Sequence, residues 1–212
     1  MAIHLARLGH RVQVVSRIGN DTNGQELLNF IQSNGLRTDH IQVDPSLPTS
    51  EVLVNLDAKN NATFEIPQPV AWDNLAYAKS LDKLSKNAGV IIYGSLGSRN
   101  AVSRGSIRKA LNNKALKIID VNLRPPYTKP AVVNELLSLA DAAKLNDNEL
   151  VTIAGWHGVN ENNMKLLMHW LKDAFNLKMV IVTRGDKGAM ALKNGDFYDH
   201  PGFSIKVKDT VG

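Results

Sequence analysis

Two polar residues in the segment KLNDNEL have the types and spacing of a site for phosphate and a metal ion. Asn146 and Glu149 lie three positions apart where an expected strand is followed by a helix, and this spacing places both on one side of the first helical turn. A carboxylate there could hold hydrated magnesium while the amide orients a phosphate. The glutamate could instead serve only to stabilise the positive end of the helix dipole. These two residues alone leave both interpretations open.

A second polar group follows the apolar run KII in the segment DVNLRPPYT. Asp120, Asn122 and Arg124 occupy alternate positions, and a pair of prolines then stiffens the chain. A planar, permanently charged guanidinium suits phosphate or substrate oxygens, so Arg124 is a candidate substrate ligand. The alternative is a solvated loop in which Arg124 makes a structural ion pair.

The segment RIGNDTNGQ follows the first expected strand. Its Asp21 could orient a polyol from the end of that strand. In the structural alternative, Thr22 and Gln25 form a capping box for the next helix, and Gly19 and Gly24 permit a tight turn.

The segment VTRGDKGAMAL offers a different kind of contact. Thr183 lies at an expected strand end, and Gly185 and Gly188 lie around the following turn. Backbone without side chains can approach a nucleotide closely, whereas a simple hairpin turn would need no ligand.

Short apolar runs that alternate with helical patterns must position these residues. This alternation predicts a parallel sheet covered by helices on both faces, and ligands of such sheets bind beyond the carboxyl ends of the strands. The expected strands are RVQVVS, VIIYGS, KIIDVN, AAKLN, MVIVTR and FSIKV. The expected helices cover residues 2–9, 22–35, 75–84, 102–111, 132–139 and 164–171.

One segment lacks any helical pattern. Val52, Val54 and Leu56 occupy alternate positions, and the turn-rich AKNNA then leads to TFEI, which predicts a β-hairpin within about residues 48–67. We expect a lid or interaction hairpin that stands clear of the main sheet, with an antiparallel edge of that sheet as the alternative.

Composition narrows the classes of protein and site. The 212 residues are 43% hydrophobic and 21% charged with a net charge of +5, which is typical of a globular protein. Lys and Arg are interspersed with acids, which argues against nucleic acid as a partner. No apolar stretch is long enough for a membrane span, and the lack of cysteine fits a cytoplasmic protein. The phosphate loop, the dinucleotide fingerprint and the nucleophile elbow are absent from the sequence.

Together these motifs resemble the ribokinase-like (PfkB) family of carbohydrate kinases, and the resemblance covers essentially the whole chain. Within the family, GSLGSRN, DVNLRPPYT and PVAWDNL look most like bacterial fructokinases, although ketodeoxygluconate kinases also contain Asp-x-Asn-x-Arg. The positions that match the family motifs are Ala2, Gly9, Gly19, Asp21, Gly24, Asn146, Glu149, Thr183, Gly185, Gly188, Asp209, Thr210, Val211 and Gly212.

The resemblance implies a three-layer α/β/α fold, with residues 1–212 forming one domain that carries the lid. It also implies ATP-dependent phosphorylation of a sugar hydroxyl, with Mg²⁺ as cofactor and K⁺ as a further candidate. The implied ATP ligands are Asn146, Thr183, Gly185 and Gly188, and the implied sugar ligands are Asp21, Asn122 and Arg124. Glu149 would hold Mg²⁺ through water and Asp209 would hold a monovalent cation.

The resemblance also predicts what the chain lacks. The family's proton-accepting Asp would lie three residues beyond Gly212, which itself begins the anion hole, and part of the sugar site would precede Met1. We therefore expect a fragment with at most residual activity, and a homodimer through the lid in the intact protein. Two alternatives are another ribokinase-family sugar or nucleoside kinase, and a sensor that binds sugar or nucleotide without turnover.

Overall fold

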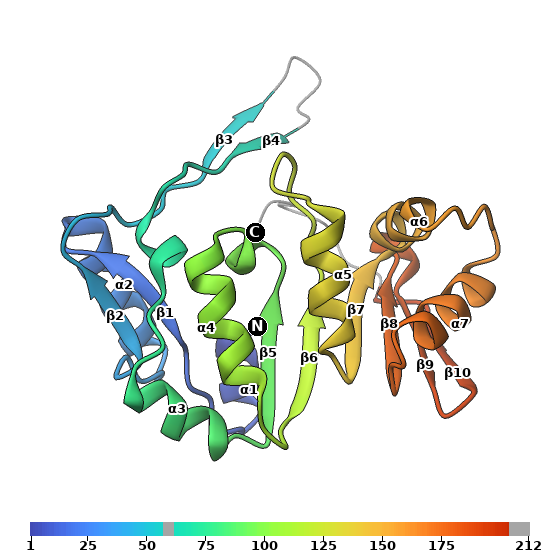
Figure 1. Cartoon of the computed structure of the whole chain (residues 1–212), viewed down its shortest axis with the longest axis horizontal. Helices are drawn as coiled ribbons and strands as arrows, with labels where there is room; N and C mark the ends of the chain where they lie inside the picture. The colour runs from blue at the N-terminus through green and yellow to red at the C-terminus, as the bar shows by residue number, and fades with distance from the viewer. Residues whose placement is uncertain (57–61, 204–212) are drawn as a thin grey trace. The chain divides into compact units, whose positions relative to one another are not determined.

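Six strands form the larger sheet of the protein (Figure 1). This computed structural model describes residues 1–56 and 62–203. The sheet order is β10-β9-β8-β7-β6-β5, in which β5 to β8 are parallel and β9 and β10 are antiparallel to their neighbours. The predicted α/β class is therefore confirmed. The strands are β5 (Val90–Gly94), β6 (Leu116–Asp120), β7 (Ala142–Asn146), β8 (Met179–Thr183), β9 (Ala189–Lys193) and β10 (Asp196–His200).

The chain divides into two compact units. Within the described residues, the first contains Met1–Leu84 and Asn100–Lys109, and the second contains Ser85–Arg99 and residues 110–203. The second unit holds the six-stranded sheet, and it is the unit that carries most of the predicted site residues. The division into one domain with an inserted lid stays a prediction.

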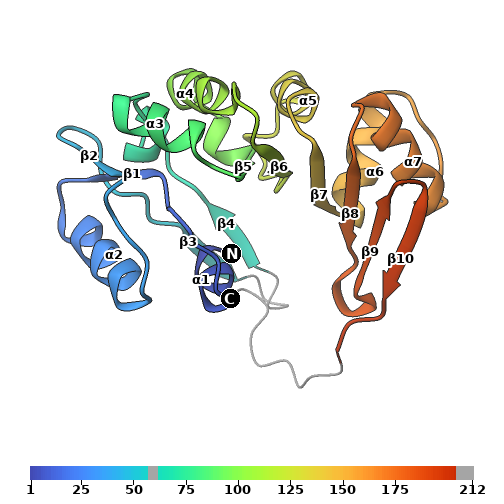
Figure 2. The same ribbon diagram turned by 90° about the horizontal axis from the view of Figure 1, so that it is seen from below.

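Helices cover one face of the six-stranded sheet. Figures 1 and 2 show α5 (Pro130–Ser138), α6 (Asp147–Trp156) and α7 (Met164–Ala174) on this face. The same-face arrangement follows because successive parallel strands are joined by right-handed crossovers in one direction. Alternate residues of β8 and β9 are buried, as are Ile119 in β6 and Leu145 in β7, and they build the core of the unit together with apolar residues of the helices. Its buried members include Ile119, Leu145, Val180, Val182, Leu136, Leu150, Ile153, Leu167, Met168 and Leu171.

The first unit contains a small parallel sheet of two strands. β1 (Ser16–Gly19) pairs with β2 (Ile41–Asp44), and α2 (Thr22–Ser33) connects them. Asp44 anchors the unit, because its buried carboxylate accepts the Ser46 and Leu47 amides and lies 2.8 Å from the Arg17 Nε. These contacts, with the Leu47 amide first, lower the pKa of Asp44 to about 2. The other elements of this unit are α1 (Ala2–Arg7), η1 (Ala71–Asn74), α3 (Lys79–Lys86), which ends just across the boundary, and most of α4 (Ala101–Leu111).

The predicted hairpin is present as a separate two-stranded sheet. β3 (Leu53–Leu56) and β4 (Ala62–Glu65) are antiparallel and pair with no other described strand. The hairpin is therefore not an edge of the main sheet within the described part of the chain, and Figure 1 shows it extending away from β1 and β2 of the same unit. Its role as a lid stays a prediction.

Several predicted elements differ from those observed. Of the expected strand RVQVVS, only Ser16 lies in β1, because the preceding residues find no partner strand beyond one bridge between Gln13 and Arg37. Helix α3 begins at Lys79 rather than at residue 75. The strand β2 was not predicted, since IQVD is short and half polar. The expected strand FSIKV lies outside the described residues except for Phe203.

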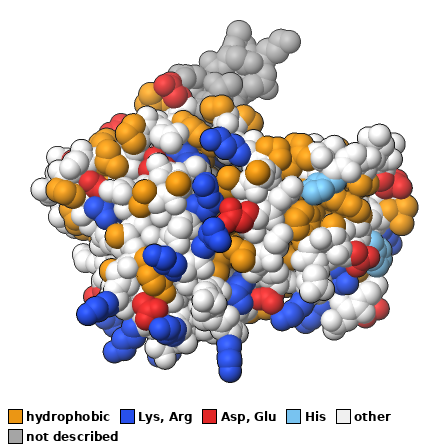
Figure 3. Space-filling view, viewed as in Figure 1, with side chains coloured by type: hydrophobic (Ala, Val, Ile, Leu, Met, Phe, Trp, Pro, Cys, Tyr) orange, Lys and Arg blue, Asp and Glu red, His pale blue; other side chains and the backbone are white. Residues whose placement is uncertain are grey.

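The surface seen in Figure 3 is mixed in charge. Lys and Arg side chains gather along α3 and α4, and acidic side chains lie between them. Among residues 1–56 and 62–203, no helix combines the length and the apolar character that crossing a membrane requires.

Candidate functional site

Asn146 and Glu149 form a complete capping box at the carboxyl end of β7. The Asn146 Oδ1 accepts the Glu149 amide at 2.8 Å, and the Glu149 Oε2 accepts the Asn146 amide at 2.8 Å. Reciprocal bonds of this kind satisfy donors that a helix start leaves unpaired. The sequence had offered the helix dipole as the structural alternative for Glu149, and the capping box itself was not predicted. The Nδ2 of Asn146 makes no hydrogen bond to any described residue, so this donor is available to a ligand.

Glu149 also reaches the neighbouring strand end. Its Oε1 accepts the amide of Leu123 at 2.8 Å, although the two residues are 26 positions apart. The Glu149 residue is only 7% exposed. One buried carboxylate therefore fastens the start of α6 and the segment after β6 to each other.

The chain leaves β6 through a sharply turned segment. Asn122 has the left-handed φ of 47°, and its carbonyl accepts the Ser95 hydroxyl at 3.3 Å. Arg124 is half-buried, and its Nη1 donates to the Leu123 carbonyl at 3.0 Å. Its remaining N–H groups make no hydrogen bond or ion pair with described residues. A guanidinium in this state can still bind the oxygens of a ligand.

An ion pair on the sheet was missed in the sequence. Lys144 Nζ lies 3.0 Å from Asp120 Oδ1, and both side chains are partly buried. The two residues are register partners on adjacent parallel strands. Each precedes a candidate residue by two positions, Asn122 and Asn146 respectively, so side-chain alternation was a signal that both belong near the site, whereas their pairing depends on the strand register.

Arg99 was also missed as part of this edge. It is 7% exposed, and its guanidinium lies 4.3 Å from the centre of the Tyr127 ring. This stacking holds the aromatic ring three residues beyond Arg124. Arg99 and Tyr127 lie far apart in the sequence, so their cationic and aromatic types were the signal that could have indicated this stacking.

Thr183 joins the group at the end of β8. It is the register partner of Asn146, and its Oγ1 lies 3.5 Å from the Leu145 carbonyl. The structure therefore brings together Asn146, Glu149, Thr183 and the segment around Asn122 at the carboxyl ends of three neighbouring strands, as predicted for ligands of such sheets.

The two glycines after β8 differ in what they require. Gly185 has a φ of 59° and open space where a side chain would lie. Gly188 has a φ of 78°, and a Cβ there would lie 2.0 Å from the His200 carbonyl oxygen. The chain's own return after β10 thus accounts for glycine at position 188, and contact with a nucleotide stays a prediction for both.

Asp21 belongs to the first unit and acts as a helix cap there. Its carboxylate accepts the Gly24 amide at 2.8 Å, and also the amide and the hydroxyl of Thr49 at 2.8 Å and 2.7 Å. The Thr49 amide first, then the Thr49 hydroxyl and the Gly24 amide, lower the pKa of Asp21. The predicted capping box of Thr22 and Gln25 is therefore wrong, because the preceding residue Asp21 is the cap.

Some predicted site residues cannot be placed. Asp209, Thr210, Val211 and Gly212 lie outside the described residues. Within the described part, no three His, Cys, Asp or Glu side chains are grouped so that they could hold a metal ion.

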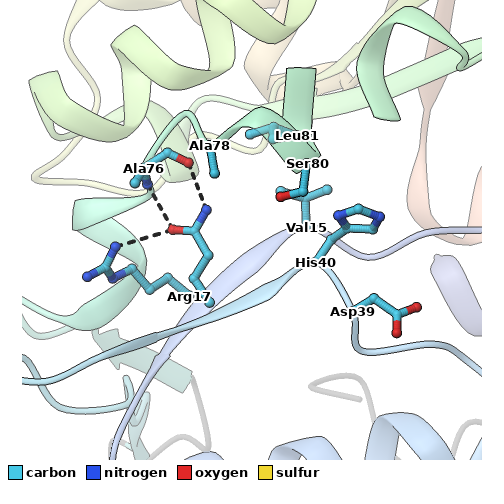
Figure 4. A pocket seen from close by; sticks show the side chains of 9 residues that line it. Val15, Arg17, Asp39, His40, Ala76, Ala78, Ser80 and Leu81 are labelled. Carbon is cyan, nitrogen blue, oxygen red and sulfur yellow. Dashed lines mark hydrogen bonds between the residues drawn. The ribbon is translucent and has the colours of Figure 1, made fainter. Parts of the chain in front are cut away.

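A cavity of about 210 Å³ lies in the first unit, and none of the predicted site residues lines it (Figure 4). Gln42 lies along it and binds Arg17 Nη1, the Ala76 amide and the Ala76 carbonyl. These polar groups therefore satisfy one another. The lining residues are Val15, Arg17, Asp39, His40, Gln42, Ala76, Ala78, Ser80 and Leu81.

Comparison with protein families gives a match along the whole chain. The model of the pfkB family carbohydrate kinases matches residues 1–212. A fructokinase-2 of Solanum habrochaites is 29% identical over 222 residues, an alignment that covers 100% of this chain and 66% of that protein. The chain thus spans slightly less than two thirds of the length of this relative.

Solved structures share the fold. A fructokinase with bound ATP from Xylella fastidiosa has a TM-score of 0.83 at 24% identity, with 98% of this chain and 66% of that chain covered. A fructokinase from Vibrio cholerae O395, in a fructose-, ADP- and calcium-bound form, has a TM-score of 0.81 at 23% identity and covers 100% of this chain and 69% of its own. The predicted ribokinase-like architecture is confirmed by these matches.

Proposed function

The chain belongs to the pfkB family of carbohydrate kinases, and we propose that it forms the central part of an ATP-dependent fructokinase. The observation that carries the proposal is the assembly of Asn146, Glu149 and Thr183 beside the Asn122–Arg124 segment at one sheet edge. The family match over residues 1–212 and the fructokinases among its relatives support the activity and the sugar.

The sugar side of the site is formed by the segment after β6. Arg124 would hold substrate oxygens with the N–H groups that no described residue uses, and Asn122 lies two residues before it. Asp21 is proposed as a further sugar ligand. Its carboxylate already accepts three hydrogen bonds, so it would contribute its remaining lone pairs.

The phosphate side is formed by the ends of β7 and β8. The Nδ2 of Asn146, which bonds none of the described residues, would donate to a phosphate oxygen. Thr183, Gly185 and Gly188 would border the nucleotide. This arrangement fits phosphoryl transfer, in which an enzyme contributes mainly positioning and stabilisation of charge.

The donor set fits Mg²⁺ held mostly by water. Each carboxylate oxygen of Glu149 accepts one backbone amide, which leaves one lone pair on each for a water ligand. Mg²⁺ usually keeps several waters and takes one or two carboxylates together with phosphate oxygens, so the single carboxylate of Glu149 could hold it through water. The ion would neutralise charge on the transferring phosphates. Asp209 is proposed to hold a monovalent cation such as K⁺.

In the reaction, a sugar hydroxyl oxygen forms a bond to the γ-phosphorus of ATP as the bond to the β-phosphate oxygen breaks. The hydroxyl proton goes to an aspartate that we propose lies three residues beyond Gly212. A missing general base lowers the rate by about 10² to 10⁴. We therefore expect the 212-residue chain to show at most residual turnover.

A coupled assay of ADP release with fructose and ATP tests this function. We expect turnover by the intact kinase, by which we mean the longer natural protein that carries this chain and that aspartate. Preference for ketodeoxygluconate, ribose or a nucleoside in the same assay would replace the proposed sugar. Binding of sugar and nucleotide without turnover by the intact protein would indicate a sensor, and full activity from the 212-residue chain would contradict the proposed base.

Arg124 allows a sharper test of the sugar side. Arg124→Ala in the intact kinase should raise the KM for sugar by about tenfold or more, because a charged hydrogen bond contributes about 1.5–3 kcal/mol, with little change in the KM for ATP. Arg37→Ala is a matched control, since Arg37 is 71% exposed and pairs with the exposed Asp39. Equal changes in the KM for sugar in the two variants would mean that Arg124 does not bind the sugar.

The hairpin of β3 and β4 is proposed as a lid that also pairs two subunits of the intact kinase. Its start exposes three consecutive apolar residues, Val52, Leu53 and Val54, at 49%, 53% and 44%, and exposed apolar groups favour an interaction surface. Light scattering of the intact kinase should give the mass of a dimer. Val54→Lys should shift it toward the monomer, and a wild-type monomer would contradict the pairing.

A further inference from the structure

The path of the chain after β6 is fixed by contacts from three directions. The Val121 amide donates to the Lys144 carbonyl at 2.9 Å, which extends the pairing with β7. The Asn122 carbonyl accepts the Ser95 hydroxyl. The Leu123 amide donates to Glu149 Oε1 at 2.8 Å, and this bond ties the segment to α6.

The backbone conformation of Asn122 needs support from these contacts of Val121, Asn122 and Leu123. Its φ of 47° lies in the left-handed region, which disfavours residues other than glycine, although asparagine tolerates it better than most. A turn of this kind persists when neighbouring contacts hold it. The bond to Glu149 holds the residue immediately after the turn.

Leu123 links Glu149 to the proposed sugar ligand. Its amide donates to Glu149, and its carbonyl accepts the Nη1 of Arg124. The Glu149 carboxylate is itself fixed, because its other oxygen accepts the Asn146 amide and the side chain is buried. A rigid carboxylate, a turned backbone and the guanidinium thus form one continuous chain of hydrogen bonds.

We propose that Glu149 is a positioning residue for the sugar as well as a partner of the phosphate side. It sets the direction of Arg124 through the backbone of Leu123, so sugar affinity depends on Glu149 even when neither metal nor nucleotide is bound. The inference rests on the proposed function. It differs from a role through Mg²⁺ alone, since such a role cannot alter sugar binding in the absence of metal and phosphate.

The test is fructose binding to the intact kinase by calorimetry, in a chelator and without nucleotide. Glu149→Gln has nearly the same shape but can accept only one of the two backbone amides. We expect its Kd for fructose to rise about tenfold, which corresponds to about 1.4 kcal/mol. Asp147→Asn is the matched control, because it makes the same charge change in the same helical turn and, among the described residues, Asp147 bonds only the neighbouring Asn148 amide. An unchanged Kd for Glu149→Gln would overturn the proposal.

Glu149→Asp separates charge from reach. This side chain keeps the negative charge that hydrated metal needs, but it is one methylene shorter and cannot span both amides. We expect the same loss of metal-free fructose affinity. Wild-type affinity in this variant would overturn the proposal.

A second measurement needs no ligand. Hydrogen exchange of the Leu123 amide in the 212-residue chain should be about tenfold faster in Glu149→Gln than in the wild type or in Asp147→Asn. Unchanged exchange would contradict the positioning role directly. If exchange is faster but the wild-type intact kinase binds no sugar, the proposed function fails and the sugar part of this inference falls with it.

Discussion

Two acidic residues in this protein do the same local task in opposite surroundings. Asp21 caps α2 and also holds Thr49, 28 positions away, while Glu149 closes the cap of α6 and also holds Leu123, 26 positions away. Asp21 is exposed, whereas Glu149 is 7% exposed. Each carboxylate therefore joins a helix start to a distant segment, but only one does so away from solvent.

The comparison predicts that burial, and not the number of hydrogen bonds, sets how much these bonds stabilise the protein. Asp21 accepts three and Glu149 accepts two. When an exposed acceptor is removed, water can take its place, whereas a buried donor that loses its acceptor carries the full cost of desolvation. We therefore expect removal of the Glu149 carboxylate to lower the stability of the protein more than substitutions around Asp21 do.

The largest effect is predicted for Glu149→Ala. The Leu123 and Asn146 amides would lose their acceptor in a partly buried place, and each unsatisfied donor costs about 1–3 kcal/mol. Unfolding of the 212-residue chain in urea should show a loss of about 3 kcal/mol. Asp147→Ala, in the same helical turn, should cost about 0.5 kcal/mol through the helix dipole. Equal losses in the two variants would contradict the contrast.

The second-largest loss of stability is predicted for Gly24, whose amide Asp21 accepts, and it arises from packing. A Cβ at Gly24 would lie 2.5 Å from the Gly19 carbonyl oxygen, so backbone must shift. Gly24→Ala should cost about 2 kcal/mol, as expected for an overpacked site. Gly155→Ala provides the opposite case, because this glycine lies in α6 with open space around it and alanine should stabilise the helix by up to about 1 kcal/mol. If urea unfolding showed a loss of stability in both variants, the assignment of the Gly24→Ala loss to overpacking would be contradicted.

A smaller effect is predicted for Thr49→Val. Its hydroxyl donates to Asp21 and accepts the Gly19 amide at 2.9 Å. Valine keeps the shape but leaves that partly buried amide without its acceptor, which should cost about 1 kcal/mol. Thr152→Val is a useful comparison, since the exposed Thr152 hydroxyl donates to the Asn148 carbonyl within its own helix and bonds no other residue that the structure describes. A urea midpoint for Thr49→Val as high as that of Thr152→Val would show that the hydroxyl contributes little.

These contrasts also explain what sequence could predict. The capping pair Asn146 and Glu149 and the strand ends beside it follow from local spacing and alternation, which a single segment encodes. The bond from Leu123 to Glu149 could not be predicted, because a backbone amide leaves no trace in the residue type. Thr49 as the partner of Asp21, and Lys144 as the partner of Asp120, depend on loop paths and strand register that only the folded chain defines.

The smallest effect is predicted for the pH dependence of the stability that Asp21 contributes, and it tests the role of solvent exposure most directly. The Thr49 and Gly24 donors lower its pKa below the ordinary value of 3.8. A lowered folded pKa means that these bonds stabilise the protein fully above the unfolded value and lose their contribution as the pH falls through the folded value. The stability difference between wild type and Asp21→Asn should therefore shrink as the pH falls from about 6 to about 3.

Asp21→Asn is suited to this measurement because asparagine keeps an acceptor for the Gly24 amide. The stability difference from the wild type therefore reports on the charge of Asp21 and on its contacts with Thr49. Urea unfolding at several pH values gives the measurement. A difference that stays constant or grows in acid would mean that the Asp21 charge does not act through these bonds. Since water can replace donors around an exposed carboxylate, even the difference at neutral pH should remain well below the loss in Glu149→Ala, and a larger one would reverse the ranking that burial predicts.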